Sequence, residues 1–155
     1  MVYVGTFSSP LQDVLPTQVD LPPGNGRGIH AFRVDMETGK LHEDHIIPMG
    51  NSPSCLTANR AGTMLYSANE TDRVGQDQKQ GSISSFRIDA ATGRLTLCNT
   101  VVSGGAGPTY LSLHPSEKFL LVPNYFAGSV SVIPVLEDGT LAEPCFVHED
   151  KGIIG

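Results

Sequence analysis

The chain has 155 residues, of which 39% are hydrophobic, and it carries a formal net charge of −6. This composition predicts a folded domain with a modest core, and it excludes a disordered tail. No run approaches the roughly 18 apolar residues that cross a bilayer, and MVYVGTFSS at the start lacks the basic and apolar regions of a secretion signal. We therefore expect a cytoplasmic protein with no membrane partner.

Charge distribution and cysteine usage narrow the expected partners further. Lys and Arg are scattered singly, which argues against a nucleic-acid partner. The cysteines Cys55, Cys98 and Cys145 lie far apart without paired spacing. The sequence therefore predicts no metal site and no disulfide, and we expect three buried, reduced thiols.

Short β-rich runs closed by turn residues follow one another along the whole chain. The first group has three runs, at residues 3–7, 28–35 and 41–48. The second group has four runs, at residues 55–59, 64–69, 82–89 and 95–102. The third group also has four runs, at residues 110–114, 119–124, 129–135 and 141–148.

An internal repeat links these groups. FRVDMETGKL at residues 32–41 returns almost unchanged as FRIDAATGRL at residues 86–95. PSCLTANRAGTMLYSANE at residues 53–70 aligns without a gap to PTYLSLHPSEKFLLVPNY at residues 108–125. The repeating unit is therefore four strands.

Four-stranded antiparallel units with a period near 50 residues predict an all-β fold, the β-propeller. We expect one domain over residues 1–155, with a partial blade at 2–48 and blades at 53–102 and 108–148. The first group lacks an inner strand, which such rings commonly take from the far carboxyl end. We interpret the chain as the amino-terminal part of a ring, about two and three-quarter blades, whose unpaired edges favour association.

Connection lengths divide the predicted blades into two rims. Tight turns such as NRAG, AATG and EDG share one rim, which we call the turn rim. The opposite rim, the loop rim, carries the long connections at residues 8–26, 71–80 and 103–108. Recognition usually resides on loops held by a rigid scaffold, so we place the site on the loop rim.

Several polar residues are expected at the loop rim. Glu70 is a candidate general base, although a rim carboxylate is more often solvated or caps a turn. Asn69 and Asn124 are candidates to orient a substrate carbonyl, with turn capping as the alternative. Tyr125 follows Asn124 directly at the end of the same predicted strand and reaches the same rim.

Charged residues and a glycine-rich loop complete the candidates. Arg73 and Lys79 are the nearest cations for a substrate phosphate or carboxylate, and solvated charges are the favoured alternative. His148 ends a strand toward the loop rim and is a candidate substrate-binding residue or a structural histidine. SGGAGP lacks the lysine and helix of a phosphate loop, so we expect a tight turn with unusual backbone angles.

Phrases along nearly the whole chain, apart from the loop at residues 8–26, resemble the lactonase family of seven-bladed propellers. The phrases that carry this resemblance are YVGTF, GIHAFRVDMETGKL, LYSANE, GSISSFRIDAATGRL, SGGAGPTYLSLHP and VPNYFAGSVSVIPV. The resemblance implies a ring of seven blades and hydrolysis of a sugar lactone, best known for 6-phosphogluconolactone in the pentose phosphate pathway. It also implies that no metal or organic cofactor is needed.

Two alternatives to lactone hydrolysis stay open. A second branch of the same fold resembles carboxy-cis,cis-muconate lactonizing enzyme and closes a lactone instead. The third alternative is a non-catalytic propeller that binds a ligand or a protein, because fold alone does not determine chemistry. The resemblance places the main catalytic residues after Gly155, so we expect this part of the ring to be inactive alone.

Tyr110 is the one clear departure from the resemblance. Proteins of the family often carry a histidine at this place, within a Gly-Pro-x-His phrase, where this chain has Tyr110. A phenol donates a hydrogen bond but is a poor base near neutral pH. We therefore regard Tyr110 as a candidate catalytic donor and as the residue that keeps the non-catalytic alternative open.

Overall fold

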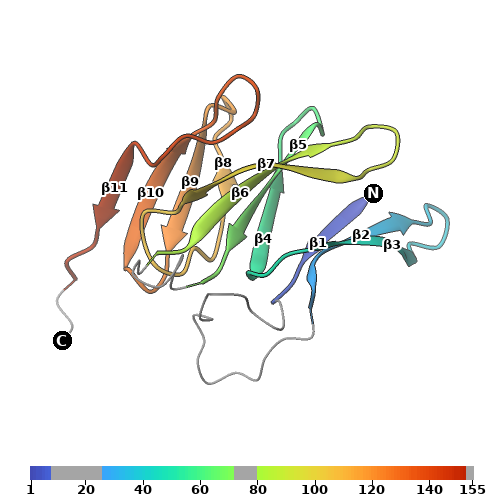
Figure 1. Ribbon diagram of the computed structural model, residues 1–155, viewed down its shortest axis with the longest axis horizontal. Helices are drawn as coiled ribbons and strands as arrows, with labels where there is room; N and C mark the ends of the chain where they lie inside the picture. The colour runs from blue at the N-terminus through green and yellow to red at the C-terminus, as the bar shows by residue number, and fades with distance from the viewer. Residues whose placement is uncertain (8–25, 72–79, 153–155) are drawn as a thin grey trace.

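A computed structural model describes residues 1–7, 26–71 and 80–152 of the chain. The regular secondary structure in these residues consists of β-strands, which form three antiparallel sheets (Figure 1). The sheets lie side by side in chain order, and strands adjacent in sequence pair within each sheet. The prediction of an all-β fold is therefore confirmed.

The strand bounds follow the sequence repeats. The first sheet contains β1 (Val2–Gly5), β2 (Gly28–Val34) and β3 (Leu41–Pro48). The second sheet contains β4 (Pro53–Ala58), β5 (Met64–Asn69), β6 (Ser82–Ile88) and β7 (Leu95–Val102). The third sheet contains β8 (Ser112–Leu113), β9 (Phe119–Asn124), β10 (Ser129–Pro134) and β11 (Phe146–Glu149).

Two strands of the third sheet are shorter than predicted. The first was expected at residues 110–114, but β8 holds only Ser112–Leu113. The last was expected at residues 141–148, but β11 begins only at Phe146. Pro144 has no backbone N–H to donate to the neighbouring strand, which explains the late start of β11.

The hydrophobic core lies between the sheets, in two clusters. The cluster between the first and second sheets is built on Ile29, Leu65 and Phe86. A larger cluster between the second and third sheets includes Ile83 and Leu120, which are both fully buried. Since each large buried apolar side chain contributes about 1.5–3 kcal/mol, these interfaces hold the sheets together.

The repeated phrase forms the turns that join the last two strands of the first and second sheets. In the second sheet, the Asp89 carboxylate accepts hydrogen bonds from the Thr92 N–H at 2.8 Å and the Thr92 hydroxyl at 2.7 Å. Asp35 and Thr38 make the same contacts in the first sheet. The sequence indicated the glycine of this turn, whereas the capping carboxylate was missed.

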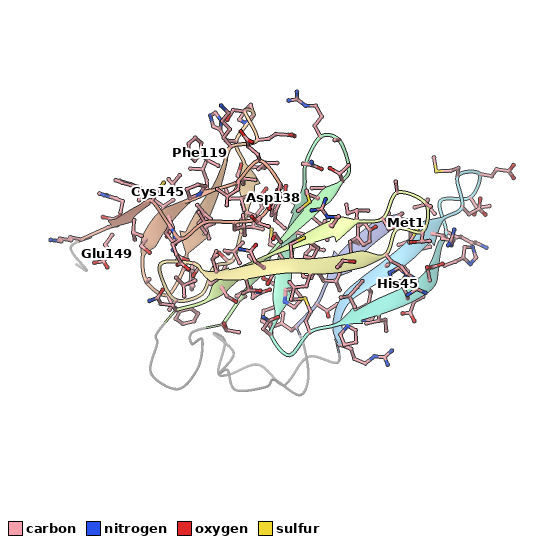
Figure 2. The ribbon with its side chains drawn as sticks, turned by 45° about the horizontal axis from the view of Figure 1, so that its top comes forward. Met1, His45, Phe119, Asp138, Cys145 and Glu149 are labelled. Atoms are coloured by element: carbon pink, nitrogen blue, oxygen red, sulfur yellow. The ribbon has the colours of Figure 1, made fainter. Side chains whose placement is uncertain are left out.

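The corresponding turns of the second and third sheets also contact the preceding sheet. A Cβ added at Gly93 would lie 2.6 Å from the Met1 side chain, and one added at Gly139 would lie 2.6 Å from Met64. Both glycines have positive φ, 71° and 85°. Figure 2 places Met1 beside the turn between β6 and β7. Only glycine suits a turn that is both left-handed and this closely packed.

The third sheet leaves one face without a neighbour among the described residues. Phe119 and Phe146 on this face are 39% and 54% exposed, whereas their counterpart face on the second sheet is buried. Cys145 is also exposed and Cys55 and Cys98 are partly buried, so the prediction of three buried thiols is wrong. All three cysteines are free. The described residues hold no helix long and apolar enough to cross a membrane.

Candidate functional site

The loop-rim ends of the second and third sheets are fastened to each other. The Gly107 N–H donates to the Thr71 carbonyl at 2.9 Å, and the Gly81 N–H donates to the Gly105 carbonyl at 2.8 Å. The first strand of the second sheet, β4, contacts both β1 and β8. The inner strands and their loop-rim ends therefore form one continuous surface.

Glu70 lies in this surface and is almost entirely buried. Its residue is 6% exposed, and its backbone N–H donates to the Ser52 carbonyl at 2.7 Å. The interpretation of Glu70 as a solvated rim carboxylate is therefore wrong. A buried carboxylate next to a loop is a group that can take up a proton from a bound water.

Ser52 and Ser54 lie beside Glu70, and sequence reasoning did not single them out. The pairing of β4 with β5 shifts between Pro53 and Cys55, so Ser54 is the extra residue of a β-bulge. The hydroxyls of both serines are buried and have no hydrogen-bond partner among the residues that the structure describes. Bulges often redirect a side chain next to an active site.

The third sheet repeats this irregularity at Tyr110. Pro108 pairs with Asn124, and Ser112 pairs with Leu121. Four positions along one strand therefore match three along the other, so the pairing shifts by one residue between these two pairs. Tyr110 lies within the step and is 60% exposed. Its hydroxyl is therefore accessible at the inner strand.

Asn69 is held inside the second sheet rather than at a turn. Its amide nitrogen donates to the Ser82 and Ser84 hydroxyls, each at 2.9 Å, and its oxygen accepts from the Ser67 hydroxyl at 3.0 Å. With no exposed surface, the side chain neither caps a turn nor faces a substrate. The alternative of a turn cap is therefore wrong, and a role of Asn69 toward a substrate stays a prediction.

Asn124 forms a similar network in the third sheet, with one hydrogen bond fewer. Its amide nitrogen donates to the Ser129 and Ser131 hydroxyls at 3.2 and 2.9 Å. Its oxygen is buried without a partner in the described part of the chain, because Val122 stands where the second sheet has Ser67. Asn124 is likewise not a turn cap.

The glycine-rich loop closes over this network. Cβ atoms added at Gly104 and Gly105 would lie 2.7 Å from the hydroxyls of Ser131 and Ser129. Gly104 also has a positive φ of 83°. The expectation of a tight turn with unusual backbone angles is confirmed, and its glycines are explained by close packing.

Three of the predicted substrate-binding residues line one open hollow of about 360 Å³ on the third sheet. They are Asn124, Tyr125 and His148. Tyr125 is 73% exposed and packs edge to face against Phe126 with ring centroids 5.4 Å apart. His148 lies on the outermost strand β11, so the hollow extends away from the inner strand β8.

Arg73 and Lys79 lie outside the described residues. Within the described ranges, no group of three or more His, Cys, Asp or Glu side chains is arranged to hold a metal ion. Among the described groups, the loop rim therefore offers a buried carboxylate, two buried serine hydroxyls and the accessible hydroxyls of Tyr110 and Tyr125. Such a set can bind a polar ester, donate hydrogen bonds and transfer a proton.

Comparisons with known proteins cover almost the whole chain. The family model described as lactonase, 7-bladed beta-propeller, matches residues 1–153. A 6-phosphogluconolactonase of Bacillus subtilis is 31% identical over 152 residues, which are 97% of this chain and 38% of that protein. A 6-phosphogluconolactonase of Formosa agariphila is 32% identical over 131 residues, 83% of this chain and 36% of that protein.

A solved structure agrees with these relatives. The periplasmic gluconolactonase PpgL of Pseudomonas aeruginosa superposes with a TM-score of 0.77 and 30% identity, over 96% of this chain and 38% of that one. The chain thus spans somewhat more than a third of the length of the proteins that it matches.

Proposed function

The chain belongs to the lactonase family of seven-bladed β-propellers, and on that premise we propose that the full-length protein hydrolyses a sugar lactone. The observation that carries the proposal is the likeness, over 97% of this chain, to a protein named 6-phosphogluconolactonase. A 6-phosphogluconolactone-like sugar ester is the proposed substrate, in the cytoplasm and in the pentose phosphate pathway. Residues 1–155 are proposed to be the amino-terminal part of one propeller domain.

The proposed chemistry uses groups of the loop rim. Glu70 takes a proton from a water molecule as its oxygen attacks the lactone carbonyl carbon. The exposed side chain of Tyr110 donates a hydrogen bond from its hydroxyl to the carbonyl oxygen while negative charge builds up there. The bond from the carbonyl carbon to the ring oxygen then breaks, and the ring oxygen takes up the proton that Glu70 accepted. The product is the open-chain hydroxy acid.

Burial supports Glu70 as the base. A carboxylate held within the folded scaffold is better positioned for proton transfer than one on an exposed turn. Glu70 is 6% exposed, whereas Glu37 in a turn of the opposite rim is exposed. The loop-rim carboxylate is therefore the better candidate for acid and base work.

Tyr125 and His148 are proposed to contact the substrate, since they line the same hollow as Asn124. An exposed aromatic ring provides a flat apolar surface with a polar edge, which suits a sugar ring. Asn124 is proposed to act without touching the substrate, because its own side chain is buried.

The test is turnover by the full-length protein. Acid release from 6-phosphogluconolactone, unphosphorylated gluconolactone and a carboxymuconate should be followed at constant pH against the spontaneous rate. We expect the sugar lactones to be hydrolysed and the muconate to be left unchanged. A folded protein that turns over none of the three compounds would contradict both enzymatic functions and leave the non-catalytic one.

A further inference from the structure

A second hollow lies at the turn rim, away from Glu70, between the second and third sheets. Its volume is about 720 Å³, within the range of small-molecule sites. The residues on which the inference rests are Tyr66, Arg87, Glu117, Lys118, Glu137 and Asp138. Tyr66 and Arg87 lie on strands of the second sheet, and the other four lie in turns of the third sheet.

Tyr66 places an unused hydroxyl in this hollow. It occupies the same position in the repeat as Tyr3, since Tyr3 pairs with Ala31 and Tyr66 with Ser85, directly before the repeated Phe-Arg. The Tyr3 hydroxyl donates to the Gly93 carbonyl at 2.6 Å. The Tyr66 residue is 1% exposed, and its hydroxyl has no hydrogen bond to another described residue.

The state of the Tyr66 hydroxyl is fixed by its surroundings. Burial, followed by the negative charges of Glu117, Cys98 and Asp138, raises the pKa of Tyr66 to about 12. The hydroxyl therefore keeps its proton around neutral pH. Because Tyr66 lines the hollow, its hydroxyl is available to donate a hydrogen bond to a ligand acceptor.

Arg87 shows the same contrast with its counterpart. In the first sheet, the Arg33 Nε donates to the Asp44 carboxylate at 2.6 Å. Cys98 stands at the place of Asp44, because both are the extra residue where the last two strands shift register. Arg87 is exposed and makes a long 3.5 Å contact to the Asp138 carbonyl. Its charge contributes to the lowered pKa of the Asp138 carboxyl, but Arg87 forms no close ion pair like that of Arg33 among the described residues.

We propose that the hollow binds a small molecule that carries a carboxylate at one end and an ammonium group at the other. The ligand carboxylate would occupy, beside Arg87, the place that Asp44 occupies beside Arg33, and would accept the Tyr66 hydrogen bond. Arginine pairs with carboxylates through strong charge-assisted hydrogen bonds. This site is independent of the proposed lactonase activity.

The ammonium group is required by the other charges of the hollow. Three carboxylates, Glu117, Glu137 and Asp138, line it together with the cations Arg87 and Lys118. The Thr140 hydroxyl and N–H hold the pKa of Asp138 below its ordinary value, so that carboxylate stays ionised. A simple anion would be repelled by this side, whereas an ammonium group complements it.

Titration calorimetry of the full-length protein with 6-aminohexanoate tests the proposal. Hexanoate and hexylamine keep the same carbon chain and carry only one of the two charges. We expect 6-aminohexanoate to bind about tenfold more tightly than either, because both ends are paired. No binding, or equal binding of the three compounds, would overturn the proposal.

Variants locate the binding in this hollow. Tyr66→Phe removes only the hydroxyl and should weaken binding about fivefold or more, whereas the control Tyr3→Phe should leave it unchanged. Cys98→Asp restores an internal partner for Arg87 and should weaken binding about tenfold. If Cys98→Asp does not fold by circular dichroism, Arg87→Gln gives the same test. Unchanged affinity in Tyr66→Phe and in the folded charge variant would refute the site.

Discussion

The repeated turns of the turn rim and the inner residues of the loop rim differ in how their polar groups are satisfied. On the turn rim, the Asp35 and Asp89 carboxylates each accept hydrogen bonds from two backbone N–H groups, and the turns repeat almost unchanged. On the loop rim, the buried hydroxyls of Ser52 and Ser54 lack partners in the described residues. The difference indicates that repetition maintains architecture, whereas departures from a fully paired structure mark surfaces available for ligands.

The largest expected effect is a loss of activity, and it compares a carboxylate of the loop rim with one of the turn rim. Glu70→Gln keeps the shape of the side chain but removes the base, so lactone hydrolysis should fall about 100-fold or more. Glu37→Gln, in an exposed turn on the opposite rim, is the matched control and should keep full activity. Initial rates under saturating substrate measure both. Equal rates in the two variants would remove Glu70 from the mechanism.

The next effect concerns stability inside the second sheet. Asn69→Ala leaves the hydroxyls of Ser67 and Ser82 without their amide partner, so the free energy of unfolding should fall by about 2–3 kcal/mol. Asn124→Ala should cost less, because the oxygen of Asn124 has no partner to lose. Urea unfolding compares them. A larger loss in Asn124→Ala would contradict the assigned networks.

A smaller effect tests the glycine-rich loop. Gly104→Ala combines a positive φ with a Cβ 2.7 Å from the Ser131 hydroxyl, and should destabilise the protein by about 2 kcal/mol. Gly128→Ala meets no atom within 4 Å and carries only the left-handed strain, about 1 kcal/mol. Thermal unfolding of both variants shows whether close packing, rather than backbone angle alone, requires Gly104.

The smallest effect belongs to the turn rim and depends on pH. Hydrogen bonds from Thr38 and Thr92, chiefly their hydroxyls, lower the pKa of Asp35 and Asp89 from 3.8. Because the folded-state pKa is depressed, this stabilisation is present above pH 3.8 and is lost as pH falls through the folded pKa.

The double variant Asp35→Asn with Asp89→Asn tests whether this stabilisation is lost, rather than gained, as the pH falls. Compared with the unmodified protein, it should lose less free energy of unfolding between pH 6 and pH 3, although the exposure of both turns keeps the difference small. Urea titrations at several pH values measure this slope. An identical pH dependence would exclude these carboxylates as its source.

Sequence predicted the fold far better than the site. Alternating runs and the repeated Asp-x-x-Thr-Gly turns are local, and they located the strands because turn chemistry depends on adjacent residues. The late start of β11 was missed, although Pro144 was a readable sign of it. The direction of Asn69 was missed because it depends on Ser82 and Ser84 across a strand pair.

The site residues found only in the structure share one property. Ser52 and Ser54 are distinguished by burial and by unpaired hydroxyls, which no spacing in the sequence reports. The contrast between Arg33 and Arg87 required the register of β7, which places Cys98 at the position of Asp44. Such differences between repeats become visible only when the strands are paired.

A crystal structure of the full-length protein with 6-phosphogluconate bound tests most directly whether lactone chemistry takes place on the loop rim. The product acid should lie at the loop-rim ends of the second and third sheets, with its carboxylate near Glu70 or Ser54. Density for the acid at the turn rim, or on a surface without either residue, would contradict the assignment of the two rims.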